Sequence, residues 1–341
     1  MARHNARPIR LVWDGKTPPA ETGEVPAPSS GARLSAHDTC YASSAHGELH
    51  AGDNLEVLRA LQRRFTGAFS LAYLDPPFLT GRVHEMKTRQ RGDAPTLEAA
   101  FDDRWSDRAA YLEALGARLR LVRELLAPEG SVIVHVDPKT SHYVKVMCDE
   151  IFGDDAFASE IIWRYRRWPA KTPNFQNVHD VLLRYRKDPS VTPRWTQLYE
   201  PLAPSTLATW GTKKQRAVVD ATTGRRLRSS SEEVESRGVP LGDVWEIGVV
   251  APIAKERTGY PTQKPEALLT RLVQSLSAPG DWVLDPYAGS GTTLAVAARE
   301  GRKFVGIDVG DAALRTTCAR LDLRRHEPDS SMNLHRTKRT A

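Results

Sequence analysis

The sequence is poor in cysteine, with only Cys40, Cys148 and Cys318 among 341 residues, and no two of them are close in sequence. This scarcity excludes a disulfide scaffold and a cysteine-based zinc site, and it favours a reducing, cytoplasmic setting. The sequence lacks a run of about 18 apolar residues, so no transmembrane helix and no membrane partner are expected. The N-terminal stretch has no apolar core of a secretory signal, and the ten histidines are too scattered to predict a metal site.

Charge of one sign is in modest excess. The chain has 48 Lys and Arg against 42 Asp and Glu, a formal net charge of +6. Most of this excess falls between residues 160 and 250, where 15 basic residues stand against 10 acidic ones and five of the eight tryptophans are found. Basic side chains neutralise phosphates and aromatic rings stack on bases, so this stretch is a candidate surface for nucleic acid. A solvated basic face over a tryptophan-rich core would give the same counts.

Strands and helices are predicted to alternate on both sides of this basic stretch. Helical apolar spacing separates short apolar runs that are typical of buried strands. These runs cover residues 68–74, 131–136, 282–285 and 304–308. The alternation indicates an α/β fold with a mainly parallel sheet that is covered on both faces. The polar segment 80–103 is predicted to be a mobile loop, and His135 is predicted to be a packed histidine within its strand.

The same pattern divides the chain into five segments. Residues 1–43, rich in Pro, Ala, Ser and Gly, are predicted to be a disordered or loosely packed N-terminal arm, and residues 326–341 a disordered basic tail. The α/β rhythm covers residues 44–187 and 255–325, which we interpret as two halves of one domain. Residues 188–254 between them are predicted to be an insertion.

A glycine-rich turn follows the predicted strand 282–285 and opens a helix. It reads Asp285-Pro286-Tyr287-Ala288-Gly289-Ser290-Gly291-Thr292-Thr293. Glycines let the backbone approach a ligand closely, and the N–H groups of a helix N-terminus attract a carboxylate or phosphate. No Gly-Lys-Ser/Thr follows, and Leu294 replaces the third glycine of a dinucleotide fingerprint. Because Asp308 at the next strand end is placed to bind ribose hydroxyls, the predicted ligand is a nucleoside with a carboxylate tail.

A second candidate site, Asp75-Pro76-Pro77-Phe78, follows the predicted strand 68–74. The prolines fix their own φ and bias the preceding residue away from helix, so the Asp75 carboxylate and the Pro76 carbonyl form a rigid pair of acceptors. With the flat face of Phe78 beside them, these acceptors suit a planar group that carries an exocyclic NH₂. Asp53-Asn54 can hydrogen-bond an adenine edge, although an aspartate in that position also simply caps a helix.

These motifs resemble those of the amino-group DNA methyltransferases. Asp75–Phe78 resembles their motif IV, the turn 285–293 their motif I, Tyr260–Pro265 their motif X, and Asp53-Asn54 the segment that contacts the cofactor's adenine. A catalytic motif that precedes the cofactor motif marks the β subgroup. The resemblance implies a Rossmann-like, mostly parallel seven-stranded sheet with circularly permuted motif order, and a target-recognition region at 188–254.

The resemblance also implies a role for each site residue. Asp75, Pro76, Pro77 and Phe78 would be catalytic, and S-adenosylmethionine would be the cofactor. Its binding residues would be Asp53, Asn54, Lys264, Asp285, Pro286, Ala288, Gly289, Ser290, Gly291, Thr292, Thr293 and Asp308. The methyl group would pass to the exocyclic amine of a flipped base in double-stranded DNA, with adenine N6 favoured.

The sequence leaves several alternatives open. Methylation of cytosine N4 is the nearest, RNA or a protein amide is a further substrate, and a non-catalytic nucleic-acid-binding protein is the alternative from another class. Intact Asp75, Gly289, Gly291 and Asp308 argue against the non-catalytic reading. A homodimer and a separate cognate restriction endonuclease are compatible with the sequence, which determines neither.

Overall fold

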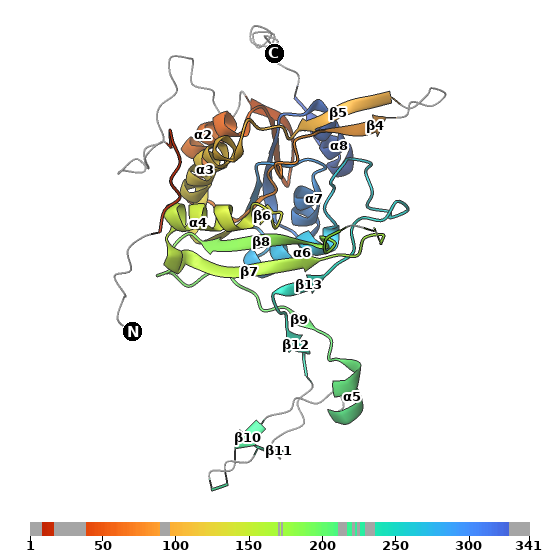
Figure 1. Cartoon of the computed structure of the whole chain (residues 1–341). Helices are drawn as coiled ribbons and strands as arrows, with labels where there is room; N and C mark the ends of the chain where they lie inside the picture. The colour runs from red at the N-terminus through yellow and green to blue at the C-terminus, as the bar shows by residue number, and fades with distance from the viewer. Residues whose placement is uncertain are drawn as a thin grey trace. The chain divides into compact units, whose positions relative to one another are not determined.

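A large mixed sheet lies at the centre of the protein, seen in a computed structural model that describes residues 9–16, 39–88, 96–169, 171, 173–210, 217–219, 222–223, 226–228 and 236–326 (Figure 1). Ten strands cross it in the order β13-β7-β8-β6-β3-β14-β15-β2-β1-β16. Their bounds are β13 (Val244–Glu246), β7 (Phe157–Arg164), β8 (His179–Arg186), β6 (Leu126–Val136), β3 (Phe69–Leu74), β14 (Trp282–Asp285), β15 (Lys303–Asp308), β2 (Gly47–Ala51), β1 (Cys40–Ser44) and β16 (Arg324–Arg325).

The middle of this sheet is parallel. Strands β6, β3, β14, β15 and β2 all run in one direction, whereas β8 is antiparallel to both β6 and β7. The predicted α/β class with a mostly parallel sheet is therefore confirmed, but the sheet has ten strands where seven were predicted. The three additional strands are short: β13 and β16 form the two edges of the sheet, and β1 lies next to β16. No apolar run in the sequence marks them.

Helices cover both faces of the sheet. Right-handed crossovers that lead in opposite directions place their helices on opposite faces, and β3-α3-β6 leads one way while β14-α7-β15 leads the other. Accordingly α2, α3 and α4 pack side by side, and α6, α7 and α8 form a second group. Their bounds are α2 (Asn54–Phe65), α3 (Arg108–Leu125), α4 (Ser141–Phe152), α6 (Glu266–Leu276), α7 (Thr292–Arg299) and α8 (Asp311–Leu321), with a 3-10 turn η1 (Asp154–Ala156) after α4. None of the described helices combines the length and apolarity needed to cross a membrane.

The segment 80–103, predicted to be a mobile loop, contains a hairpin instead. Strand β4 (Val83–Thr88) pairs antiparallel with β5 (Thr96–Asp102), and the rings of His84 and Phe101 stack with their centroids 4.4 Å apart. The hairpin also contacts α8 through β5. The prediction was wrong because polar strands carry no apolar run, and because the cross-strand pairs that order them are not visible in a linear pattern.

Residues Thr196–Gly242 form a second compact unit, separate from the unit that contains the sheet. This unit contains two short strand pairs and one helix, among its described residues. They are β9 (Tyr199–Glu200) with β12 (Val239–Pro240), β10 (Ala217–Val219) with β11 (Arg226–Arg228), and α5 (Pro204–Trp210). The insertion predicted at 188–254 is longer than this unit, since residues 188–195 and 243–254 belong to the sheet-containing unit.

Part of the predicted N-terminal arm lies against α4. The ammonium group of Lys16 is 2.7 Å from Oε2 of Glu150, and the backbone N–H of Leu11 donates to Oε1 of the same carboxylate at 2.6 Å. The end of the predicted arm belongs to β1. Residues 1–8, 17–38 and 327–341 lie outside the described residues, so the remaining arm and tail stay predictions.

Candidate active site

The carboxyl ends of β3, β14 and β15 open into a cavity of about 400 Å³. Ligands bind at this edge of open parallel sheets, and the volume is in the range of sites for small molecules. Of the predicted site residues, Gly291 does not line the cavity. Those that do are Asp53, Asn54, Asp75, Pro76, Pro77, Phe78, Lys264, Asp285, Pro286, Ala288, Gly289, Ser290, Thr292, Thr293 and Asp308.

The two carboxylate oxygens of Asp75 have different surroundings. Oδ2 accepts a hydrogen bond from the Lys264 ammonium group at 2.5 Å, and the same ammonium lies 5.1 Å from the centroid of the Phe78 ring. Oδ1 is buried and has no hydrogen-bond partner among the described residues. A buried acceptor without a partner is costly, so Oδ1 is available for an N–H group of a ligand.

The turn that follows Asp75 is held by Asp103, the residue after β5. Its buried carboxylate accepts hydrogen bonds from the backbone N–H groups of Leu79 at 2.9 Å and Thr80 at 2.8 Å, and from the Thr80 hydroxyl at 2.6 Å. Leu79 has a φ of 57°, which is uncommon for a residue other than glycine. These three bonds stabilise that backbone and so fix the position of the neighbouring Phe78 ring.

A buried histidine lies behind Asp75. In β6, Nδ1 of His135 is 2.7 Å from the Tyr73 hydroxyl and 3.9 Å from Oδ1 of Asp75. Its Nε2 is 3.3 Å from Oδ2 of Asp180, whose Oδ1 accepts from the Tyr165 hydroxyl at 3.0 Å. Burial raises the pKa of Tyr73 far above its ordinary value, so this hydroxyl stays protonated beside Nδ1.

The glycine-rich turn after β14 is held by Asp308 of β15. Gly289 and Gly291 have φ values of 52° and 71°, which favour glycine. Oδ2 of Asp308 accepts from the Gly289 N–H at 2.8 Å, and Oδ1 accepts from the Gly310 N–H at 2.8 Å. Burial raises the pKa of Asp308. The carboxyl group therefore positions the turn, in addition to the ribose-binding role predicted for it.

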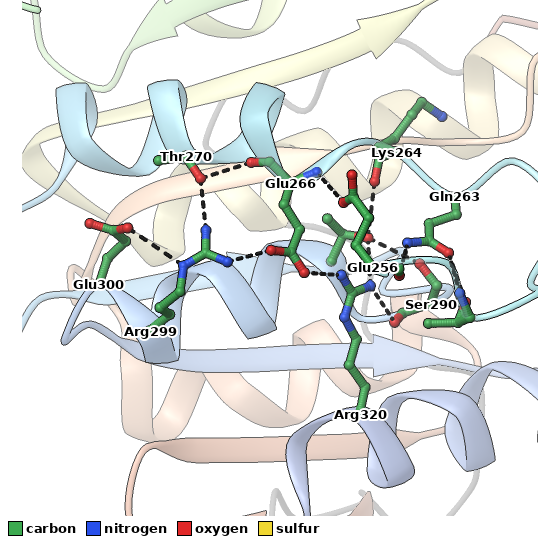
Figure 2. Close-up of polar contacts among 11 residues, drawn as sticks. Glu256, Gln263, Lys264, Glu266, Thr270, Ser290, Arg299, Glu300 and Arg320 are labelled. Carbon is green, nitrogen blue, oxygen red and sulfur yellow. Dashed lines mark hydrogen bonds and ion pairs between the residues drawn. The ribbon is translucent and has the colours of Figure 1, made fainter. Parts of the chain in front are cut away.

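Gly291 lies outside the cavity because its open side faces α8. A β-carbon at this position would come within 2.8 Å of the Thr317 side chain, so only glycine allows α8 to pack this closely. Figure 2 shows Arg320 of α8 between the turn and α6. Its guanidinium donates to the Ser290 carbonyl at 3.2 Å and to Oε1 of Glu266 at 2.5 Å. The turn is thereby fixed on the side away from the cavity.

Asp285, the last residue of β14, is a fully enclosed carboxyl group. Its Oδ1 accepts from the Tyr287 N–H at 3.0 Å. Burial raises its pKa to about 7, and the neighbouring charges of Asp75 and Asp308 act in the same direction. Near neutral pH this carboxyl group therefore exists in both protonation states.

Asp53 and Asn54 connect the start of α2 to the glycine-rich turn. Asp53 caps the helix, with its Oδ1 accepting from the Leu55 N–H at 2.9 Å, and it also lines the cavity. The amide of Asn54 donates to the Pro286 carbonyl at 2.9 Å and accepts from the guanidinium of Arg118. The capping role and a place at the cavity wall thus coexist.

Similarity to known proteins places this architecture in a family. Residues 69–318, from β3 to α8, match the family model described as DNA methylase. The chain belongs to the DNA methylase family. It is 27% identical over 295 residues to the DNA adenine methyltransferase YhdJ of Escherichia coli (strain K12), a similarity that covers 86% of this chain and 88% of the relative. It is also 29% identical over 318 residues to the type II methyltransferase M.EcaI of Enterobacter cloacae, covering 79% of this chain and 68% of the relative.

The fold of this DNA methylase is shared with a solved structure, the PvuII DNA methyltransferase (cytosine-N4-specific). The TM-score is 0.52 at 16% sequence identity, and the superposition covers 82% of this chain and 87% of the other. The family model confirms the predicted amino DNA methyltransferase family, and the shared fold confirms the predicted fold class. The protein is a DNA methyltransferase, and S-adenosylmethionine is its cofactor.

The cavity of this DNA methylase fits that cofactor. The carboxyl groups of Asp75, Asp285 and Asp308 line it, and they favour a ligand that carries positive charge, as a sulfonium and an ammonium group do. The first N–H groups of α7 lack helical partners and favour a carboxylate. The roles assigned above to single residues of the cavity stay predictions.

The DNA methylase site also contains residues that sequence reasoning missed, because they reach it from other elements. They are Asp103, Arg118, His135, Tyr165, Asp180 and Arg320. His135 was predicted to be a packed histidine, and it is fully buried. A polar residue within an otherwise apolar strand was the one signal of its contact with the residues around Asp75.

Three potential metal ligands lie together near the β16 edge of the sheet, a grouping that the sequence did not predict. Ligand atoms of Cys40, Glu48 and His50 are within 4.8 Å of one another. Arg64 donates to both carboxylate oxygens of Glu48, and burial raises the pKa of the Cys40 thiol to about 11. The guanidinium of Arg64 thus already neutralises the carboxylate that a cation would need.

Proposed function

We propose that this DNA methylase transfers a methyl group to the N6 amine of adenine in double-stranded DNA. The observation that carries the proposal is Oδ1 of Asp75, which is buried without a partner among the described residues. Together with the Pro76 carbonyl it offers two acceptors for the two hydrogens of an exocyclic amine. The similarity to the DNA adenine methyltransferase YhdJ supports adenine over cytosine as the target.

Asp75 and Pro76 would activate the target amine. Its lone pair is delocalised into the aromatic ring, so the nitrogen is a poor nucleophile. Hydrogen bonds from both amine hydrogens to these acceptors localise the lone pair on nitrogen, while Lys264 keeps the carboxylate in place. When bound, S-adenosylmethionine supplies the methyl group as an electrophile. Oδ1 of Asp75 would also accept the proton that the amine releases.

Phe78 would hold the target base. A base inside a duplex cannot reach a cavity at the edge of a sheet, so it must be extruded from the helix at a cost of a few kcal/mol. Stacking on the Phe78 ring offsets part of that cost. The region 188–254 is proposed to recognise the target sequence, which would make the methylation site-specific.

Nucleoside analysis tests the proposed base. DNA from cells that express the chain is hydrolysed and the modified nucleoside is identified by mass spectrometry, with cells that carry an Asp75→Ala variant as the control. We expect N6-methyladenine. Detection of N4-methylcytosine would show that the enzyme methylates cytosine. The absence of any methylated base would contradict the proposal. Long-read sequencing of the same DNA would identify the target sequence.

Further parts of the proposal concern subgroup and partners. Residues 75–78 precede the turn 285–293, which is the motif order of the β subgroup. A separate cognate restriction endonuclease is suggested by the similarity to M.EcaI, a type II methyltransferase. The sequence does not determine whether the chain forms a homodimer, and light scattering of the purified chain tests this.

A further inference from the structure

We propose that the loop between β7 and β8, residues 165–178, is a DNA wedge that binds the duplex backbone and fills the space left by the extruded base. This inference rests on the proposed function, because it concerns the duplex from which the target base is taken. The wedge would act outside the cavity, on the part of the DNA that stays stacked.

The loop begins and ends beside the place proposed for the target base. Tyr165, the first residue after β7, donates to Asp180 near the start of β8, and Asp180 is bonded to His135. The imidazole of His135 lies 5.7 Å from the Phe78 ring, measured between ring centroids. Tyr165 and Asp180, at the two ends of the loop, are therefore linked through His135 to the Phe78 ring on which the base would stack.

All Asp, Glu, Lys and Arg residues in the loop are basic. Arg166, Arg167 and Lys171 are exposed, and no Asp or Glu occurs between residues 166 and 178. Residues 160–195 contain eight basic and three acidic side chains, whereas the compact unit 196–242 contains seven and five. The positive excess of the region 160–250 therefore belongs mainly to β7, β8 and their loop. Such a cluster attracts the phosphates of a duplex.

Two aromatic rings project from the same loop into solvent. The side chains of Trp168 and Phe175 are 93% and 99% exposed. The amide of Gln176 donates to the Trp168 carbonyl at 2.8 Å and joins the two arms, so both rings start from neighbouring points. Large exposed rings amid cations suit a partner that offers both phosphates and flat apolar faces. Duplex DNA does so once a base has left its stack, and apolar side chains inserted between bases are a known means of stabilising that state.

Substrate rescue tests the wedge. A synthetic duplex carrying the target sequence mapped for the wild type is compared with one in which the base opposite the target is removed, so that extrusion costs less. For the double variant Trp168→Ala and Phe175→Ala we expect kcat/KM to fall about tenfold or more on the intact duplex. On the second duplex it should return to within about threefold of the wild-type value, because the wedge is no longer needed.

Two further variants exclude a general effect on folding. Phe175→Leu keeps an apolar wedge and should retain most of the activity. Ile9→Ala removes a side chain that is 78% exposed in the segment against α4, and should change neither substrate's kcat/KM. An equal loss of kcat/KM on both duplexes would overturn the wedge. No loss of kcat/KM in the double variant would also overturn it, and would indicate that the rings bind a protein partner. If the wild type methylates no DNA at all, the proposed function itself fails.

Discussion

The two carboxylate oxygens of Asp75 differ: Lys264 holds Oδ2, and Oδ1 is buried without a hydrogen-bond partner among the described residues. This arrangement needs a carboxylate, since an asparagine would offer either its oxygen or its amide nitrogen at each position, but never two acceptors. The ion pair also keeps the side chain in one orientation. The position is thus built to accept hydrogen bonds.

Asp75→Ala should lower kcat roughly 10³-fold, because the amine would lose the acceptor that localises its lone pair. Binding of S-adenosylmethionine should change by less than about threefold, since the turn 285–293 is untouched and only the neighbouring Lys264 loses its partner. Calorimetry measures the binding, and incorporation of labelled methyl groups measures kcat. Asp243→Ala, which removes an exposed carboxylate, serves as the control. Full activity of the Asp75 variant would refute its catalytic role.

Asp285 predicts a pH dependence of stability. Its folded-state pKa of about 7 lies above the ordinary 3.8, so the folded protein holds a proton that the unfolded chain has released between those values. The free energy of unfolding should therefore fall as the pH rises towards 7. The Asp285→Asn variant lacks this titrating group, so its free energy of unfolding should not show this decrease. The difference in free energy of unfolding, variant minus wild type, should therefore increase by up to about 3 kcal/mol from pH 5 to pH 8.

Urea unfolding at both pH values measures this difference, and comparison of the two proteins cancels the contribution of all other titrating groups. If the gap between variant and wild type is the same at pH 5 and pH 8, the carboxyl group does not titrate with a raised pKa.

For single residues, the sequence predicts site residues that are contiguous in a motif, but not their contacts with residues that are distant in the sequence. Asp75-Pro76-Pro77-Phe78 is legible because the prolines and the preceding apolar strand are adjacent. His135 and Asp180 are 45 residues apart, and each comes from a different strand. Their contact depends on the order of strands in the sheet, which a single sequence does not specify.

Among the elements, the contact of α8 with the glycine-rich turn has the tightest geometry. Gly291 and Thr317 meet where no β-carbon fits, and Arg320 joins α8 to α6 through Glu266. Arg299 of α7 binds the other oxygen of the same carboxylate (Figure 2). Three helices are therefore tied together at Glu266.

The two arginines provide a matched pair of variants. The Arg320 side chain is 9% exposed and that of Arg299 48%. Arg320→Met should lower the free energy of unfolding by about 2 kcal/mol and weaken S-adenosylmethionine binding about tenfold, because the turn loses its support. Arg299→Met should cost less than about 1 kcal/mol and leave the cofactor affinity unchanged, since its ion pair is screened by solvent.

Chemical unfolding and calorimetry measure both effects. Equal losses in the two variants would show that Arg320 contributes through its charge alone, without a specific role in holding the turn.

The alternation of apolar strands with helices is the part of the fold that the sequence reveals, because burial on both faces leaves a continuous apolar run. The hairpin β4–β5 and the short strand β13 are not predicted by such apolar runs. Their residues alternate weakly or number only three, and their order comes from pairing partners.

At the scale of the whole molecule, the chain forms two compact units, and the predicted site residues lie in only one of them. The sheet-containing unit includes every predicted site residue, and the unit 196–242 contains none. The residues that flank the smaller unit in the sequence are held within the larger unit. Arg194 N–H donates to the Glu129 carbonyl at 2.9 Å, and the Asp243 carbonyl accepts from Ile162 at 2.8 Å.

Replacing residues 196–242 by a flexible linker of about ten residues should therefore leave the larger unit folded. We expect its melting temperature to change by only a few degrees and S-adenosylmethionine binding by less than about threefold, whereas sequence-specific methylation should be lost. Calorimetry and long-read sequencing measure these outcomes. Retention of the wild-type methylation pattern would exclude the unit 196–242 from target recognition.

The position of β3 in the sheet has a consequence for synthesis of the chain. Strands β2 and β3 emerge from the ribosome early, yet β14 and β15, which are made last, lie between them. The partner of Asp75, Lys264, follows it by 189 residues. The growing chain must therefore keep two unpaired strand edges apart from other chains until its C-terminal third appears. A truncated or stalled product would have the catalytic segment without the cofactor turn, so that only finished molecules can mark DNA.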